Sequence, residues 1–194
     1  MRRTIHLARH ASHAEVGQIL SGRSDIALNE RGRSEADRLA RRLAHVPLAA
    51  IHASPRRRAR ETADIVAETH SLEVNTVAAL DEIDFGVWSG QPFAVLDAQR
   101  DWQRWNAARA TAATPAGETM ASVTSRALDH ILAIPNEGAV LCVSHCDVIR
   151  GIVARVLGLG FDRMFAFDCD PASLTTIEID GASMRLATLN ERPQ

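Results

Sequence analysis

The sequence lacks the features that define several classes of protein. It has three cysteines, too few and too irregularly spaced for a disulfide framework or a CxxC zinc site: Cys142, Cys146 and Cys169. No apolar run approaches the length of a membrane span. Arg2, Arg3 and Arg9 interrupt the first residues, so no apolar signal core can form there. Free thiols without these signals indicate a cytoplasmic protein.

The sequence also has little net charge. The formal value of -2 provides no overall field that would attract nucleic acid or an anionic membrane, so neither partner is expected. We find no internal repeat and no low-complexity segment. With 194 residues, 46% hydrophobic and 24% charged, the chain is expected to fold as one domain over residues 1–194, in an oligomeric state that the sequence leaves open.

Short apolar segments rich in Val, Ile and Leu are typical of strands in a buried sheet. They lie at 4–8, 48–53, 74–80, 139–144, 174–179 and 184–189. Helical patterns separate most of them, and the last two strands follow one another. This order predicts an α/β fold, a three-layer sandwich whose mostly parallel sheet of about six strands has helices on both faces. In such a fold the active site lies beyond the carboxyl ends of the strands.

Capping residues predict where the helices begin. Asn29 is a suitable N-cap for an amphipathic helix. Ser54 and Pro55 suit the cap and the first position of a second helix. Further helices are expected at about 92–108, 118–134 and 147–157.

Basic side chains and histidines collect where these elements meet. The first strand runs into Arg9 and His10, and the fourth runs into His145, so both histidines should stand at one edge of the sheet. The next helix is expected to begin at about Asp147, so the amides that follow His145, with Cys146 the first of them, would point into the same crevice. Arg58 lies in a basic run at the start of another helix, whose N-terminus adds positive partial charge. The pattern indicates an anion site.

These motifs resemble those of the histidine phosphatase superfamily, which includes the cofactor-dependent phosphoglycerate mutases. Leu7-Ala8-Arg9-His10 is similar to the family's Arg-His-Gly signature. The resemblance continues in chain order to about Arg150 through the segments 22–33, 54–63, 80–90 and 143–145. Five blocks in the right order are far more specific than any one of them.

The resemblance implies a role for each matching residue. His10 attacks phosphorus, and the phosphoryl oxygens are held by Arg9, Arg58 and His145. Glu82 falls on the position of the proton donor, a role that requires burial to raise its pKa against the neighbouring positive charges. Arginines can neutralise the phosphoryl charge that magnesium handles in other enzymes, so neither a metal nor another cofactor is expected.

The sequence departs from the family pattern at several positions. Ala11 replaces the usual glycine, which is compatible only with a negative φ angle. His13 and Val16 stand where the family often has threonine and a phosphate-contacting asparagine, so one oxygen donor is missing. Gln18 is a candidate substitute, and Arg23 is a candidate ligand for a second anionic group of the substrate.

Two other groups of residues lie near the predicted site in the sequence or fold over it. A metal cluster is disfavoured because its third member would lie in a loop beyond the strand that carries the others: His6, His10 and His13. The tryptophans are expected to pack a helix over the crevice, with an aromatic wall for the substrate as the alternative: Trp88, Trp102 and Trp105.

The function expected from these residues is metal-independent hydrolysis of small phosphate monoesters through a phosphohistidine. The alternatives are a phosphoglycerate mutase-type transferase, a phosphohistidine protein phosphatase and a non-catalytic phosphate-binding module. The stretch between Glu82 and His145 is short for a mutase, which must enclose its substrate to exclude water, so hydrolysis is favoured.

Overall fold

The computed structural model describes residues 2–135 and 138–193, and its centre is one six-stranded sheet. The spatial order is β3-β2-β4-β1-β5-β6. The first four strands pair in parallel, whereas β5 and β6 are antiparallel to their neighbours. The strands are β1 (Arg2–Arg9), β2 (Leu48–Ala53), β3 (Val74–Thr76), β4 (Ala139–Ser144), β5 (Leu174–Asp180) and β6 (Ser183–Glu191). The predicted α/β fold with a mostly parallel sheet is confirmed.

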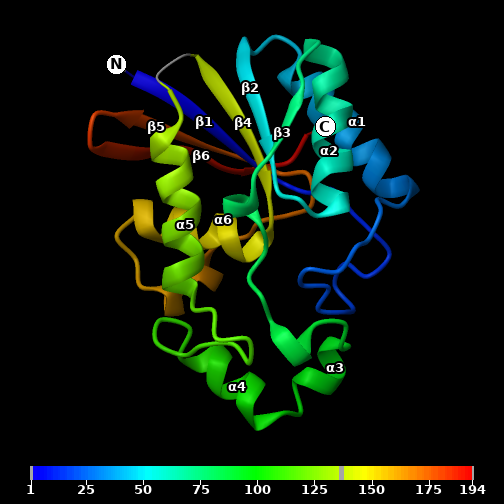
Figure 1. The fold of residues 1–194 in the computed structure, drawn as a ribbon, viewed down its shortest axis with the longest axis vertical. Coiled ribbons are helices and arrows are strands. Elements are labelled where there is room, and N and C mark those ends of the chain that lie inside the picture. The colour runs from blue at the N-terminus through cyan, green and yellow to red at the C-terminus, as the bar shows by residue number, and fades with distance from the viewer. Residues whose placement is uncertain (1, 136–137, 194) are drawn as a thin grey trace.

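Helices cover both faces of this sheet, as the alternation of the strand side chains requires. Ile5 and Leu7 of β1 pack into the apolar cluster of α5 (Met120–Ala133) and α6 (Cys146–Val156). Ala8 of β1 points the other way, into the cluster of α1 (Glu30–Leu43) and α2 (Arg57–His70). Figure 1 shows the sheet between these helices. The three-layer arrangement therefore follows from the two-residue period of the strands.

The helix starts expected at Asn29 and at about 118 are correct, and the cap expected at Ser54 is wrong. The Asn29 side chain accepts a hydrogen bond from the Gly32 amide at 2.8 Å and caps α1. Thr119 begins α5 with a reciprocal capping box. Ser54, however, does not cap α2, which begins only at Arg57 with no side-chain cap. The Ser54 hydroxyl instead lies 2.7 Å from Nε2 of His145, so the site uses it.

Two other predicted elements are shorter than expected. The strand predicted over 74–80 ends at Thr76, and a short 3₁₀ turn (Ala78–Leu80) follows. After Thr76 the chain leaves the edge of the sheet and reaches the end of β4, where Ser144 Oγ donates to the Leu80 carbonyl. The carboxylates that follow Leu80 therefore lie near this end of β4. The helix predicted over 92–108 is split into α3 (Phe93–Leu96) and α4 (Arg100–Ala107). Asp97 causes the break, because it accepts hydrogen bonds from the side chains of Trp102 and Gln103.

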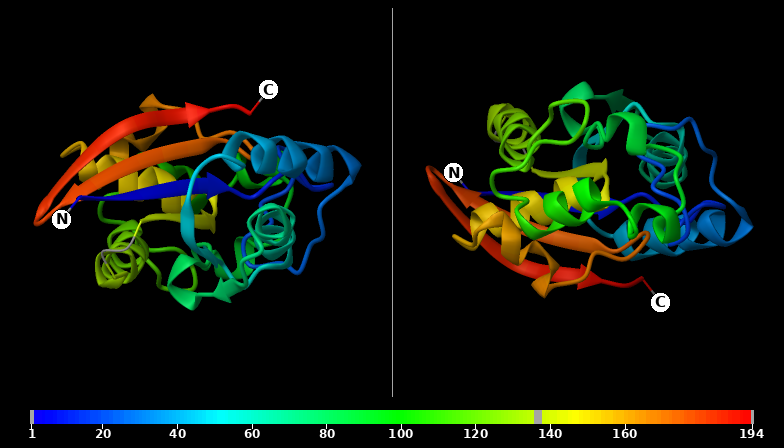
Figure 2. Two further views of the ribbon diagram at one scale, coloured as in Figure 1. Left: turned by 90° about the horizontal axis from the view of Figure 1, so that it is seen from above. Right: turned by 90° about the horizontal axis from the view of Figure 1, so that it is seen from below.

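The site edge of the sheet is where β1 and β4 end side by side. The chain leaves β1 toward α1 on one face and leaves β4 toward α6 on the other, which makes this edge a topological switch point. The α3 and α4 segments lie beyond it, at the bottom of Figure 1. The β5–β6 hairpin follows one side of the molecule (Figure 2). In the part of the chain that the structure describes, no helix has the length and apolarity to cross a membrane.

Gly32, in the first turn of α1, packs closely against the backbone of Ser12, two residues after His10. A Cβ atom at Gly32 would stand 1.9 Å from the carbonyl oxygen of Ser12. We expect Gly32→Ala to lower the free energy of unfolding by about 1–3 kcal/mol through overpacking. Gly160→Ala is the control, since a Cβ there meets no atom within 4 Å. Urea unfolding curves in which both variants match the wild type would contradict the predicted clash.

Candidate functional site

The register between β1 and β4 places the two motif histidines together. Arg9 pairs with Ser144 at the last position of both strands, so the next residues, His10 and His145, are neighbours. Their ring centroids are 5.2 Å apart. Both side chains are almost completely buried, with exposed fractions of 3% and 0%. The prediction that two strands deliver a histidine to one edge is correct.

His10 is held in a form suited to nucleophilic attack. Its Nδ1 lies 2.9 Å from the Ala11 carbonyl, an acceptor, so this nitrogen carries the proton and Nε2 keeps a free lone pair. Burial first, and then the charges of Arg58, His145 and Arg9, lower the pKa of His10 well below its ordinary value. The ring is therefore neutral near pH 7. Ala11 keeps a negative φ, as the missing glycine required.

Arg9 and Arg58 line a cavity of about 650 Å³ beside His10. Protein carbonyls anchor one side of each guanidinium: Arg9 donates to Cys169 at 2.6 Å, and Arg58 donates to Gly22 at 2.6 Å and Ser24 at 3.0 Å. The Nε atom of each is buried and has no hydrogen-bond partner among residues 2–135 and 138–193. Buried donors normally find an acceptor, so these two are suited to an anionic ligand.

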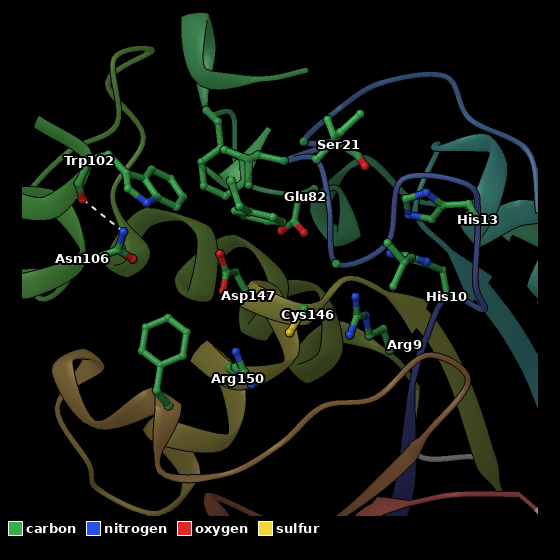
Figure 3. A pocket seen from close by; sticks show the side chains of 18 of the residues that line it. Arg9, His10, His13, Ser21, Glu82, Trp102, Asn106, Cys146, Asp147 and Arg150 are labelled. Atoms are coloured by element: carbon green, nitrogen blue, oxygen red, sulfur yellow. Dashed lines mark hydrogen bonds between the residues drawn. The ribbon is translucent and has the colours of Figure 1, made fainter. Parts of the chain in front are cut away.

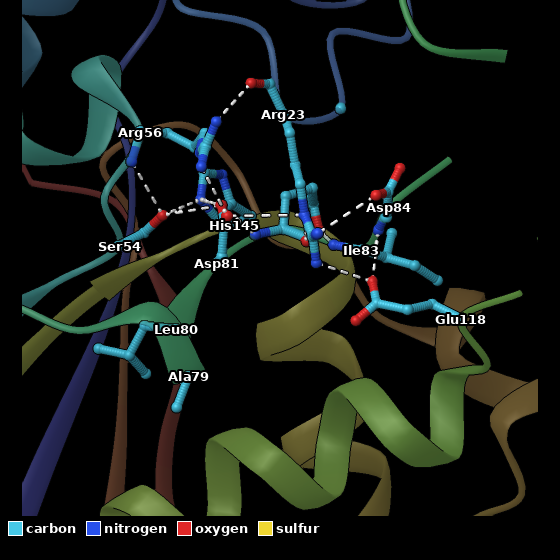
Figure 4. A network of polar contacts seen from close by, with 12 residues as sticks. Arg23, Ser54, Arg56, Ala79, Leu80, Asp81, Ile83, Asp84, Glu118 and His145 are labelled. Carbon is cyan, nitrogen blue, oxygen red and sulfur yellow. Dashed lines mark hydrogen bonds and ion pairs between the residues drawn. The ribbon is translucent and has the colours of Figure 1, made fainter. Parts of the chain in front are cut away.

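His145 is placed one step behind the cavity. Its Nδ1 accepts a hydrogen bond from Arg58 at 3.1 Å, and its Nε2 lies 2.7 Å from Ser54 Oγ. Ser54 in turn donates to Asp81 at 3.3 Å, which completes a relay that Figure 4 shows. His145 is not among the residues that line the cavity. In this structure His145 contacts Arg58 and Ser54, and its direct contact with the phosphoryl oxygens stays a prediction.

Glu82 reaches the cavity and has the electrostatics of a proton donor. Burial first, and then the negative charge of Asp147, raise the pKa of Glu82 to about 8, and the opposing effect of Arg58 is smaller. The carboxyl is therefore mostly protonated near pH 7. Asp81 and Asp84, its neighbours in sequence, do not line the cavity. Figure 3 shows Glu82 facing the cavity with Arg9, His10 and Cys146.

His13 lines the cavity, a position that the sequence analysis did not assign to it. Its ring centroid is 5.2 Å from that of His10, and its Nδ1 accepts a hydrogen bond from the Glu15 amide, which leaves the proton on Nε2. Burial lowers the pKa of His13 to about 4. The Nε2 proton of His13, on the cavity wall, is thus a candidate for the missing donor. Gln18, the substitute expected, is exposed and lies outside the lining.

Arg23 is not among the residues that line the cavity, and its expected contact with a second anionic group stays a prediction. Its guanidinium lies 2.9 Å from Glu118, 3.3 Å from Asp84 and 3.5 Å from Asp81 (Figure 4). It also donates to the backbone carbonyl of Glu82 at 2.9 Å. These partners tie Arg23 to the acid-bearing segment.

Cys146 lines the cavity at the first position of α6, as expected from its place after His145. A hydrogen bond from the Cys169 thiol, together with the charges of Arg9 and Arg150, lowers the pKa of the Cys146 thiol to about 7. His145, the N-cap, provides no side-chain cap for the first amides of α6. This helix end therefore adds positive potential to the cavity.

The tryptophans form the packing layer that was expected, and one of them also contacts the cavity. Trp88, Trp102 and Trp105 lie within 5.3–5.9 Å of one another between ring centroids. Trp102 lines the cavity, and the other two do not. His6 is separate from this region, because its Nδ1 contacts Thr176 Oγ1 at 3.1 Å and its side chain is absent from the lining.

Comparisons with known proteins agree with this geometry. The family model "Histidine phosphatase superfamily (branch 1)" matches residues 5–192. The chain is 31% identical over 191 residues to phosphoserine phosphatase 1 of Hydrogenobacter thermophilus, covering 95% of this chain and 90% of that protein. It is 30% identical to a probable phosphoglycerate mutase GpmB of Proteus mirabilis, covering 80% and 75%.

A solved structure extends the likeness to three dimensions. The mycobacterial glucosyl-3-phosphoglycerate phosphatase is similar with a TM-score of 0.87 and 26% sequence identity, over 98% of this chain and 100% of that one. The motifs, the sheet and the histidine pair thus occur together over nearly the whole chain. The chain belongs to the histidine phosphatase superfamily.

Proposed function

We propose that residues 1–194 form one catalytic domain that hydrolyses small phosphate monoesters through a phosphohistidine on His10. One observation carries the proposal: a neutral, buried His10 with a free Nε2 stands between Arg9 and Arg58. In the described residues the Nε donors of both arginines lack partners. The three unpaired cysteines support a cytoplasmic location for this enzyme.

Binding of the phosphoryl group follows from the charges around His10. Arg9 and Arg58 line the cavity and have Nε donors without a partner in the described residues, and His13 carries its proton on Nε2, so we assign these three side chains to the phosphoryl oxygens. The first amides of α6, beginning at Cys146, add a helix N-terminus. His145 acts as a positioning residue, since it orients Arg58 through the 3.1 Å hydrogen bond. Two arginines in a buried site can balance the charge of a phosphate without a divalent cation.

The reaction requires one nucleophile and one proton donor. His10 Nε2 attacks phosphorus, and the bond from phosphorus to the ester oxygen breaks while Glu82 gives that oxygen its proton. The ionised Glu82 then takes a proton from water as the water attacks phosphohistidine. Phosphate leaves, and both His10 and Glu82 return to their starting forms. The pKa of about 8 for Glu82 allows both roles near neutral pH.

Phosphoryl transfer to a second substrate is the second candidate, because the chain is similar to a probable phosphoglycerate mutase. Hydrolysis ranks first because the chain has no long insertion between Glu82 and His145 to exclude water. A protein substrate and a non-catalytic binding role rank lower. The complete set of His10, Arg9, Arg58 and Glu82 argues against a role in binding alone. The size of the cavity that they line, about 650 Å³, suits a small molecule better than a protein substrate.

His10→Ala tests the nucleophile. We expect phosphate release from p-nitrophenyl phosphate to fall to the background rate, with the thermal unfolding midpoint close to that of the wild type.

The same assay, run with and without excess chelator, tests the metal-free site, and wild-type activity should survive the chelator. An active His10→Ala variant would disprove the phosphohistidine, and a chelator-sensitive wild type restored by magnesium or zinc would disprove the metal-free site.

Glu82→Gln tests the proton donor. Hydrolysis of an alkyl phosphate, whose leaving group is a strong base, should slow by about 10²–10⁴-fold, and hydrolysis of an aryl phosphate should slow far less. In the wild type the alkyl rate should decline as pH rises through about 8, because the protonated carboxyl is lost. The matched control is Asp84→Asn, since Asp84 is outside the cavity. Leaving-group dependence in the control and not in Glu82→Gln would show that the acid is misassigned.

Cys146 provides a test of phosphate binding that needs no turnover. With a thiol pKa of about 7, Cys146 should react with iodoacetamide near neutral pH, whereas burial raises the pKa of Cys142 to about 12. Inorganic phosphate should slow alkylation of Cys146, as measured by peptide mass spectrometry. Equal alkylation rates with and without saturating phosphate would argue against an anion bound at the start of α6.

A further inference from the structure

Two of the three cysteines contact one another although they lie 23 positions apart in the sequence. The Cys146 thiol donates to the backbone carbonyl of Cys169, with 3.8 Å between sulfur and oxygen, and the Cys169 thiol donates to Cys146 Sγ. Both thiols are free. Cys146 begins α6, and Cys169 lies in the segment between a 3₁₀ helix (Phe161–Ala166) and β5. The fold therefore brings two reduced sulfur atoms together beside the cavity.

The two thiols differ in their access to the cavity. Cys146 is half-buried and lines the cavity, so a small molecule in the cavity can reach its sulfur. Cys169 has an exposed fraction of 5% and is not among the lining residues. A solute that enters the cavity thus meets Cys146 first, with Cys169 directly behind it.

The surroundings also make Cys146 the more reactive thiol, since the thiolate is the nucleophile. The hydrogen bond from Cys169 and the charges of Arg9 and Arg150 outweigh burial and lower the pKa of Cys146 to about 7. The same hydrogen bond, followed by burial, raises the pKa of Cys169 well above its ordinary value. In Figure 3 Cys146 lies between Arg9 and Arg150. An accessible thiol of low pKa next to a second thiol is the arrangement found in redox-sensing cysteines.

Cys169 is also attached to the phosphoryl site. Its backbone carbonyl accepts a hydrogen bond from Arg9 Nη1 at 2.6 Å, and the Ala172 amide donates to the Arg9 carbonyl at 3.1 Å. A disulfide joins its sulfur atoms at about 2 Å, far closer than two hydrogen-bonded sulfur atoms. Formation of this bond would therefore draw the Cys169 backbone toward α6 and displace the carbonyl that anchors Arg9.

We propose that Cys146 and Cys169 form an oxidation site, at which a hydroperoxide converts the two thiols into a disulfide and thereby weakens phosphate binding at Arg9. The effect on activity rests on the proposed function, because it acts through an arginine assigned to the phosphoryl oxygens; formation of the bond does not. A disulfide in a reducing compartment is transient, and a dithiol reverses it by exchange. The oxidised protein is thus a reversible form of low activity.

The oxidation proceeds in two balanced steps. The Cys146 thiolate attacks one oxygen of the hydroperoxide, so that a sulfur–oxygen bond forms, the oxygen–oxygen bond breaks, and the other oxygen takes a proton and leaves as an alcohol. The Cys169 thiol then attacks the sulfur of this sulfenic acid; the disulfide forms, and the hydroxyl leaves as water with the Cys169 proton. With hydrogen peroxide, the two thiols lose two electrons and two protons, and the peroxide becomes two molecules of water.

Peptide mapping after mild oxidation tests the pair. The purified protein is treated with a small excess of hydrogen peroxide, its remaining thiols are blocked with iodoacetamide in denaturant, and the unreduced digest is analysed by mass spectrometry. We expect a linked peptide that joins Cys146 to Cys169, with Cys142 alkylated. The kcat/KM for p-nitrophenyl phosphate should fall by at least about tenfold, the usual scale of one charge-assisted hydrogen bond, and dithiothreitol should restore it.

Two variants separate the disulfide from other oxidation. Cys169→Ala cannot close the bond, so peroxide should leave a sulfenic acid on Cys146 that dimedone traps. Cys142→Ala changes a cysteine with 0% exposure inside β4 and should give the same linked peptide as the wild type. The activity of each variant is compared with that of its own untreated sample, and a thermal unfolding curve checks that the variant folds.

The outcomes distinguish the pair from the phosphatase. Oxidation of Cys146 in the wild type without any linked peptide would overturn the pair. A linked peptide with unchanged kcat/KM would overturn the effect through Arg9. An untreated protein that does not hydrolyse p-nitrophenyl phosphate would reject the proposed function and the effect on activity with it, while the linked peptide alone would still decide whether Cys146 and Cys169 form the oxidation site.

Discussion

The parallel pairing of β1 with β4 is the constraint on which the site depends. Because Arg9 and Ser144 are aligned at the ends of the two strands, His10 and His145 must emerge next to one another. The chain then turns to opposite faces of the sheet, which opens a crevice between the two turns. A shift of one residue in this register would send one histidine to the wrong side of the sheet, so the hydrophobic alternation that fixes the register also fixes the site.

The electrostatics of the crevice separate groups of similar chemistry into different roles. Burial and the nearby arginines lower the pKa of His10, so its ring is available as a neutral nucleophile. Burial and Asp147 raise the pKa of Glu82, so its carboxyl retains a proton. Asp147 itself is paired with Arg109 at 3.1 Å and lies in the first turn of α6. Two carboxyl groups in one cavity can therefore act as proton donor and fixed negative charge.

Buried arginine is costly, and the fold compensates for it with backbone carbonyls. Arg58 has an exposed fraction of 1%, yet the carbonyls of Gly22 and Ser24 and the ring of His145 accept its hydrogen bonds. These acceptors are neutral, so Arg58 keeps its positive charge for a ligand. Arg23 shows the opposite arrangement, because carboxylates surround it and neutralise it. The two arginines thus differ in whether carboxylates neutralise their charge.

The periodicity of the sequence alone determined most of the secondary structure. Five of the six strands, the cap at Asn29 and the helix before β4 depend on residues close in the chain, where alternation and capping act directly. The motif order likewise identified the family and brought Arg9, His10, Arg58 and Glu82 into consideration. Each of these four residues lines the cavity.

Only the tertiary structure decided which polar side chains, far apart in the sequence, hydrogen-bond to one another and which line the cavity. Serine is a residue type that often caps helices, but the hydroxyl of Ser54 instead hydrogen-bonds to His145, which is far away in the sequence. Arg23 and Gln18 stand in a loop near the signature, and whether they meet the cavity depends on how the acid-bearing segment packs against that loop. His13 became a candidate once the fold placed it on the cavity wall. Local patterns specify elements, whereas long-range packing and hydrogen bonds specify which polar group faces a ligand.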